Sequence, residues 1–160
     1  MTEIIKANYT TTQHANDLLK LLNNYACDPM GGGEELPSAT KQQLITKLAQ
    51  RDGAMSLLAY TDNGEAIGLL NAFEGFSTFA AAPLLNIHDV YVAPSYRGNG
   101  IATALFQHAE QLARAGGCCK VTLEVLSGNE AAKQAYATMG YAAYELDKSA
   151  GHALFWQKKL

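Results

Sequence analysis

The stretch with the clearest chemical potential is Val90–Ala102. It opens with three β-prone residues, Val90–Val92, and a proline that ends the strand because it has no N–H for the ladder. Gly98 and Gly100 then allow backbone conformations closed to other residues and let a ligand approach the main chain. A helix beginning there presents unpaired N–H groups and the positive end of its dipole, and Arg97 adds a permanent charge. These features suit an anion such as a diphosphate, although a plain strand-to-helix turn in an α/β domain has the same pattern.

The same stretch resembles a motif of a known enzyme family. Arg97–Ala102 matches the Arg/Gln-x-x-Gly-x-Gly/Ala signature of the GCN5-related N-acetyltransferases, the GNAT family. A second signature of that family is matched by Asn129, Ala132, Tyr136 and the pair Gly140-Tyr141. Other phosphate-binding motifs fit less well, because a dinucleotide fingerprint needs glycine where Thr103 stands and the chain has no Gly-Lys-Ser/Thr sequence.

This resemblance implies an α/β (α+β) GNAT fold in which residues 1–160 form a single domain. The expected sheet is mixed, mostly antiparallel and of about six to seven strands, with helices on both faces and a splay between the fourth and fifth strands. The implied activity is direct transfer of an acetyl group from acetyl-CoA to an amine of a small molecule or a protein. No metal and no covalent enzyme intermediate are implied. The residues expected to bind the cofactor are Val90, Tyr91, Val92, Arg97, Gly98, Asn99, Gly100, Ile101, Ala102, Thr103, Asn129, Ala132 and Tyr136.

The main chain of Val90–Val92 matters more to this interpretation than its side chains do. A pantetheine arm can pair like an extra strand with an exposed strand edge, and the resemblance places that edge here. One backbone N–H, which we expect to be that of Val90, would face the thioester oxygen and stabilise the charge that it gains. The side chains themselves fit an ordinary core strand.

Two side chains are predicted to move protons. A phenol with a pKa of about 10 is protonated at neutral pH, and the resemblance points Tyr136 at the CoA sulfur as the acid for the departing thiolate; core packing is the alternative. His88 stands nine residues before Arg97, where some relatives carry a glutamate base, and histidine is a competent base at pH 7. Holding a water, binding substrate or packing stay open for His88. Adjacent strand residues point to opposite faces, so a pair between His88 and Asp89 is not expected unless a bulge intervenes.

The acceptor amine is the least determined part of the interpretation. By resemblance it enters opposite the cofactor, near the first two helices and the loop before the fourth strand. The candidate residues are Tyr25, Asp28, Glu34, Phe76, Phe79 and Asn86. Acidic and aromatic groups together suit a cationic amine, while a solvated loop beside a hydrophobic rim explains them equally well. A small amine, an amino acid derivative, an aminoglycoside-like amine and a protein lysine or N-terminus all stay open.

The composition narrows the class of protein. A chain of 160 residues, nearly half of them apolar, suits one folded domain. A net charge of −3 with scattered basic residues predicts no positively charged surface that would bind nucleic acid or an anionic membrane. Without a membrane-spanning run or a signal-peptide pattern, a cytoplasmic protein is expected. Three cysteines, Cys27, Cys118 and Cys119, fit neither a disulfide framework nor a zinc site, so we expect reduced thiols that are at least half-buried.

Apolar periodicity and turn residues predict the order of the elements. Strands are expected at residues 3–7, 54–61, 66–73, 84–92, 119–125, 141–146 and 153–158, with an Asn-Gly hairpin joining the second and third. Helices are expected from a threonine cap at residues 10–12 to about 28, from about 38 to 53, and over 100–115 and 130–139. Thr40 and Gln43 have capping-box spacing, and Asn129 is a cap candidate. By analogy with relatives, the two terminal strands could pair across a homodimer.

Two other classes of function stay open. A catalytically inactive acyl-CoA-binding sensor or regulatory module would keep the glycine turn; Tyr136 argues against it and His88 slightly for it. Thiol release with a panel of amines separates a sensor from an enzyme. A nucleotide-binding α/β protein is the second alternative, in which ATP or NAD would compete with acetyl-CoA.

Overall fold

The computed structural model describes residues 2–145, 147, 149 and 151–160. Contacts divide the chain into two compact units, Met1–Leu123 and Glu124–Leu160. Among the described residues, the first unit contains the sheet, three α-helices and the short 3₁₀ helix Pro94–Tyr96, and the second contains one α-helix and the C-terminal segment. The assignment of residues 1–160 to a single domain stays a prediction.

A five-stranded sheet in the order β1-β2-β3-β4-β5 forms the centre of the first unit. Its strands are β1 (Thr2–Lys6), β2 (Ala54–Thr61), β3 (Ala66–Ser77), β4 (Ala82–Val92) and β5 (Val121–Leu123). Neighbours from β1 to β4 are antiparallel, and β5 runs parallel to β4. The mixed, mostly antiparallel sheet and the β2–β3 hairpin are therefore confirmed. For the described residues, the predicted number of about six to seven strands is too high. The fifth strand is shorter than predicted.

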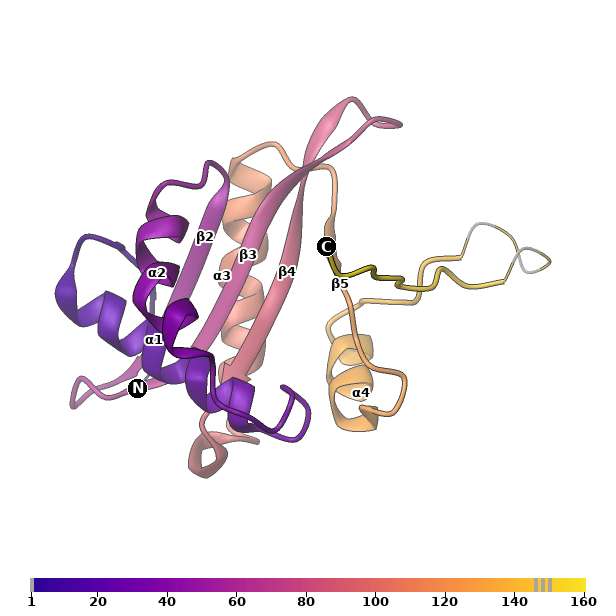
Figure 1. Ribbon diagram of the computed structural model, residues 1–160. Helices are drawn as coiled ribbons and strands as arrows, with labels where there is room; N and C mark the ends of the chain where they lie inside the picture. Colours follow the sequence, from indigo (N-terminus) through magenta and orange to yellow (C-terminus); the bar gives the residue numbers. More distant parts are fainter. Residues whose placement is uncertain (1, 146, 148, 150) are drawn as a thin grey trace. The chain divides into compact units, whose positions relative to one another are not determined.

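Helices cover both faces of this sheet, as expected (Figure 1). On one face lie α1 (Thr12–Cys27) and α2 (Ser38–Ala49), whose buried leucines pack on Leu58 and Leu69. On the other face lies α3 (Ile101–Ala115), which buries Leu105 and Phe106 completely. This packing is close, since a Cβ added to Gly68 would lie 3.2 Å from Ile101 Cγ2.

The helix ends differ from the predicted caps in two places. Thr11 is the N-cap residue of α1, but its side chain makes no capping hydrogen bond. The first helical residue of α2 is Ser38, directly after Pro37, so Thr40 and Gln43 lie inside the helix and the predicted capping box is wrong. The helix also ends at Ala49, earlier than its predicted end at Gly53.

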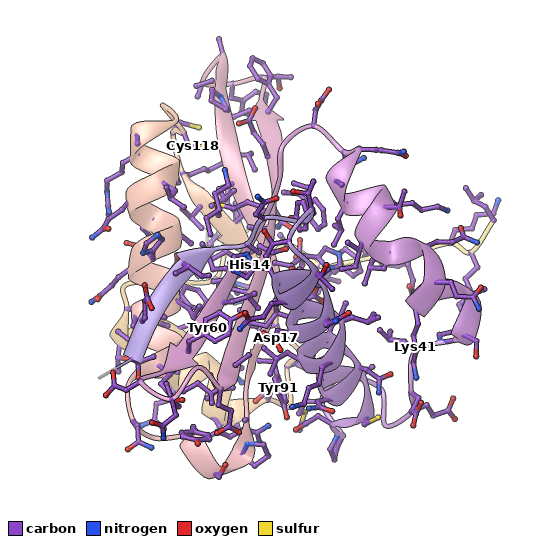
Figure 2. All side chains as sticks on the ribbon, turned by 90° about the vertical axis from the view of Figure 1, so that its left-hand side faces the viewer. His14, Asp17, Lys41, Tyr60, Tyr91 and Cys118 are labelled. Atoms are coloured by element: carbon purple, nitrogen blue, oxygen red, sulfur yellow. The ribbon has the colours of Figure 1, made fainter. Side chains whose placement is uncertain are left out.

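One hydrogen bond ties α1 to the sheet. Tyr60 on β2 donates from its hydroxyl to Asp17 Oδ2 over 2.8 Å, and Figure 2 shows these two side chains together beside His14. Burial and the neighbouring carboxylate both disfavour a phenolate, so the pKa of Tyr60 is raised and the phenol stays a donor. This contact helps to fix α1, which carries Tyr25 and leads into Asp28.

The second unit contains α4 (Glu130–Thr138), and its predicted cap is confirmed because Asn129 Oδ1 accepts from the N–H of Ala132 over 3.1 Å. The two predicted terminal strands are wrong for the described residues, where pairing is reduced to one bridge between Glu145 and His152. Leu146 lies outside the described residues. An isolated hairpin is marginally stable, and the segment leaves Trp156 83% exposed. The suggestion that these segments pair across a homodimer stays a prediction.

No helix in the described ranges is both long and apolar enough to cross a membrane. All three cysteines are free. Only Cys118 is half-buried, while Cys27 and Cys119 are exposed, so the expected burial is wrong for two of the thiols.

Candidate active site

The edge of β4 that faces β5 opens halfway along the strand. Pairing with β5 covers Leu85 to Ile87, whereas β4 continues to Val92. The N–H of Ala93 donates to Ile67 on β3 over 2.9 Å, and hydrogen-bonded residues alternate along an antiparallel ladder. The main-chain groups of Val90 and Val92 therefore face the open side. Within the first unit, residues 88–92 have no strand on that side.

The glycine turn follows at the end of this edge. Gly98 and Gly100 have φ values of 78° and 77°, and Gly100 is the N-cap of α3. A Cβ on either glycine would meet no described atom within 4 Å, so the space over the main chain is open. From Gly98 to Thr103, no backbone N–H donates a hydrogen bond to another described residue. The turn thus fits a diphosphate, because it offers free N–H groups at the positive end of a helix.

Arg97 is held beside the turn by two hydrogen bonds. Its Nε donates to the carbonyl of Val92 and its Nη2 donates to Asp28 Oδ2, each over 2.9 Å. The guanidinium also lies 5.7 Å from the centroid of the Tyr91 ring. The hydrogen bond from Arg97 and a further one from the N–H of Met30 lower the pKa of Asp28. Arg97, predicted to bind the cofactor, and Asp28, predicted to bind the acceptor, therefore form an ion pair.

We expect Asp28→Asn to tighten CoA binding by about two- to fivefold, because pairs between partly exposed groups contribute up to about 1 kcal/mol. Removal of the carboxylate frees the Arg97 guanidinium for the diphosphate and removes a like charge near it. Isothermal titration calorimetry with CoA measures this effect at neutral pH, where the lowered pKa keeps Asp28 ionised. Glu35→Gln is the matched control, since it breaks the Lys41–Glu35 pair instead. Unchanged or weaker binding in Asp28→Asn would contradict the expectation.

A β-bulge in β4 places His88 and Asp89 together. Asn71 pairs with Asp89 while Ala72 pairs with Ile87, which leaves His88 as the extra residue. A bulge of this kind turns neighbouring side chains away from strict alternation. His88 Nδ1 consequently lies 3.3 Å from Asp89 Oδ1. The expectation that the side chains of His88 and Asp89 point to opposite faces of the sheet is therefore wrong, because a bulge does intervene.

A chain of hydrogen bonds continues from Asp89 into the core. Asn71 Nδ2 donates to Asp89 Oδ2 over 2.9 Å, Ser56 Oγ donates to Asn71 Oδ1 over 2.6 Å, and the Tyr9 hydroxyl lies 3.0 Å from Ser56 Oγ. Ser56 and Asn71 are buried, so the network restrains the carboxylate. Burial raises the pKa of Tyr25, as do the charges of Asp89 and Asp28, which places this phenol near both carboxylates.

A hollow of about 420 Å³ opens next to His88, on the face of the sheet covered by α1 and α2. The His88 ring meets the Phe73 ring edge-on, with 5.6 Å between centroids. Arg51 lies over the same phenyl ring, with its guanidinium carbon 5.6 Å from the centroid. The lining residues are Leu44, Lys47, Leu48, Arg51, Phe73, Asn86 and His88. The hollow combines an apolar surface with histidine, amide and cationic groups.

Of the six residues predicted for the acceptor, Asn86 lines this hollow. Tyr25 belongs to the polar group near Asp28 and Asp89, and its ring lies 6.2 Å from that of Tyr91. Glu34 is exposed in the loop between α1 and α2. Phe76 and Phe79 are 63% and 99% exposed where β3 turns into β4.

Sequence reasoning missed three residues around His88, namely Lys47, Arg51 and Asn71, and it did not expect the fourth, Asp89, to contact His88 without a bulge. Two signals were available. Lys47 and Arg51 have the i,i+4 spacing of one helix face, although α2 ends at Ala49 and Arg51 follows in the turn. Asn71 is a polar residue inside an otherwise apolar strand, a position that requires a hydrogen-bond partner. The other predicted residues, Asn129, Ala132 and Tyr136, belong to the second unit.

Comparison with known proteins identifies the family. The sequence model described as "Acetyltransferase (GNAT) family" matches residues 18–141. An aminoglycoside N(6')-acetyltransferase type 1 from Acinetobacter genomosp. 13 is 30% identical over 102 residues, which cover 62% of this chain and 70% of that protein. A glucosamine 6-phosphate N-acetyltransferase from Trypanosoma brucei brucei is 26% identical over 149 residues, covering 91% and 95% respectively.

The fold agrees with a solved structure titled AAC(6')-Iy in complex with the bisubstrate analogue CoA-S-monomethyl-acetylneamine. The TM-score is 0.78 at 18% sequence identity, and the match covers 100% of this chain and 99% of that one. The chain therefore belongs to the acetyltransferase (GNAT) family. Enzymes of this family are acyltransferases that use acetyl-CoA as the acetyl donor.

Proposed function

We propose that this N-acetyltransferase acts on the amine of a small molecule, using Val90–Thr103 to hold acetyl-CoA and His88 as the base. The observation that carries the proposal is the continuity of two main-chain features. The open edge of β4 at residues 88–92 leads into a turn whose N–H groups, from Gly98 to Thr103, have no partner among described residues. An extended amide-containing arm that ends in a diphosphate matches both features.

When bound, acetyl-CoA supplies the thioester that the amine attacks. The N–H of Val90 faces the open side of β4, where it would donate to the thioester oxygen. Gly98, Gly100 and the first turn of α3 would hold the diphosphate, with Arg97 as the adjacent cation. Tyr136, by its place in the second family signature, is proposed to protonate the departing thiolate.

His88 is proposed to take the proton that the amine must lose. A primary ammonium has a pKa of about 10, so a base is needed at neutral pH. The contact between His88 Nδ1 and Asp89 Oδ1 leaves Nε2 as the ring nitrogen for substrate. Asp89, held in turn by Asn71, acts as a positioning residue.

The size of the hollow supports a small acceptor. Its volume of about 420 Å³ lies within the roughly 300–1,000 Å³ typical of small-molecule sites. The relatives named above are an aminoglycoside acetyltransferase and a glucosamine 6-phosphate acetyltransferase, and both names specify a small amine. An aminoglycoside is polycationic, whereas glucosamine 6-phosphate carries a phosphate beside its amine. The charge of the residues that line the hollow therefore bears on which kind of acceptor fits.

The proposal is tested by free-thiol release from acetyl-CoA with a panel of small amines and a lysine-containing peptide, with mass spectrometry of each product. We expect amine-dependent thiol release and acetylation of small amines. Acetylation of the peptide alone would overturn the choice of acceptor. Tight CoA binding without amine-dependent release from any acceptor would favour a sensor.

We expect His88→Ala to lower kcat/KM by roughly 10²–10⁴-fold, the usual contribution of a general base. The acidic limb of the pH–rate profile, where an imidazole base is protonated, should disappear with it. His108→Ala on α3, on the opposite face of the sheet, is the matched control and should keep both rate and limb. A His88→Ala enzyme that retains the acidic limb would show that another group is the base.

A further inference from the structure

The charged groups that line the hollow are of one sign. Lys47 and Arg51 both line it, and no carboxylate does so among the described residues. Neither cation forms an ion pair with another residue of the described ranges. Four other cationic side chains do have carboxylate partners: Lys41, Arg97, Arg114 and Lys133. The hollow therefore concentrates positive charge that the described chain does not neutralise.

The cation Arg51 and the proposed base His88 lie against the same aromatic ring. Arg51 and His88 contact the same phenyl ring, that of Phe73, each at 5.6 Å from its centroid. Stacking on an aromatic face leaves the N–H donors at the guanidinium edge available, and those donors match carboxylate and phosphate oxygens. Leu44 and Leu48 supply apolar surface in the same hollow. A molecule bound there would meet both a base, His88, and the two cations Lys47 and Arg51.

We infer that the acceptor is an amine that also carries an anionic group, a carboxylate or a phosphate, which binds Arg51 and Lys47 while the amine meets His88. This inference rests on the proposed function and specifies its substrate class. A short aliphatic segment between the two groups would lie along Phe73, Leu44 and Leu48. A polycationic amine is disfavoured, because a second ammonium would be placed beside two unpaired cations.

The test compares amines of one chain length that differ in the charge at the far end: 4-aminobutanoate, butan-1-amine and 1,4-diaminobutane. 3-Aminopropylphosphonate represents the phosphate class and distinguishes it from the carboxylate class. We expect kcat/KM for at least one anionic amine to exceed that of the diamine by roughly tenfold or more, because hydrogen bonds between charged groups are stronger than those between neutral ones. A wild-type preference for the diamine, or equal use of all four amines, would overturn the inference.

Charge reversal provides the sharper comparison. Arg51→Glu and Lys47→Glu should each reduce or invert the preference for the anionic amine and leave the KM for acetyl-CoA unchanged. Lys20→Glu makes the same charge change on α1 outside the hollow and should keep the wild-type preference. Thermal denaturation of all variants checks that they are folded. If Arg51→Glu and Lys47→Glu, both folded, retained the wild-type preference, the anion would not bind at this site.

Failure of the proposed function can be distinguished from failure of this inference by measuring binding instead of acetylation. If the wild-type enzyme acetylates no amine in the series, calorimetric binding of the same four compounds to the protein still decides the inference. Binding of an anionic amine that is lost in Arg51→Glu supports it. Absence of binding, or equal binding of the diamine, overturns it.

Discussion

Gly100→Val is expected to abolish acetyl-CoA binding. Gly100 begins α3 with φ 77°, and the space that its Cβ would occupy is empty of described protein atoms. In the proposed complex the diphosphate occupies that space, so a valine side chain would block the approach to the N–H groups. Valine also resists a positive φ, which would shift the turn itself. Calorimetric titration with CoA should show a loss of affinity of roughly a hundredfold or more, as blocked main-chain hydrogen bonds to a charged ligand each contribute about 1.5–3 kcal/mol.

Gly117→Val separates steric blocking from backbone strain. Gly117 lies just beyond the other end of α3, has φ 73° and would also place a Cβ in empty space. Both variants should therefore lose similar stability in thermal denaturation. CoA affinity should fall in Gly100→Val alone. Preserved affinity in a folded Gly100→Val protein would refute the placement of the diphosphate at this turn.

Tyr136→Phe is expected to lower kcat by roughly tenfold or more, with little change in affinity for acetyl-CoA. General acids typically contribute 10²–10⁴-fold, and a thiolate leaves more readily than an alkoxide, so the minimum expected loss of roughly tenfold lies below that range. The change removes one hydroxyl and keeps the ring that lies 6.4 Å from that of Tyr141. Steady-state thiol release gives kcat, and calorimetry gives the affinity.

The matched control for this variant is Tyr144→Phe, the same chemical change on an exposed tyrosine of the same unit. It should leave kcat at the wild-type level. Equal turnover of Tyr136→Phe and wild type would remove Tyr136 from the mechanism. A parallel loss of kcat and CoA affinity would indicate a structural role for its hydroxyl.

Much of the fold was predictable because its signals are local. The Asn-Gly turn between β2 and β3, the cap at Asn129 and the glycine at the start of α3 each depend on the backbone preferences of a few adjacent residues. The terminal strands failed for the converse reason. Alternation over residues 141–158 is a local pattern, but strand formation needs a neighbouring sheet, and the described part of this segment forms a single bridge.

In the candidate site, too, features formed by adjacent residues were predictable and contacts between distant residues were not. The glycine turn was readable because consecutive residues form it, and its function depends on main-chain groups. The ion pair between Arg97 and Asp28 could not be predicted from the sequence, because these residues are far apart in the chain and meet only after α1 packs on the sheet. The contact between His88 and Asp89 depends on one extra residue in the β3–β4 register, which no pattern within β4 alone specifies.

The sequence by itself determined the family, the glycine turn and the strand and helix that flank it, because short-range spacing encodes all of them. Tertiary structure alone decided which side chains surround His88. Residues from α2, β3 and β4 meet there through the packing of helices on the sheet and the register of its strands. The positive charge of the hollow arises from that packing, since Lys47 and Arg51 become neighbours of His88 only when α2 lies across the sheet.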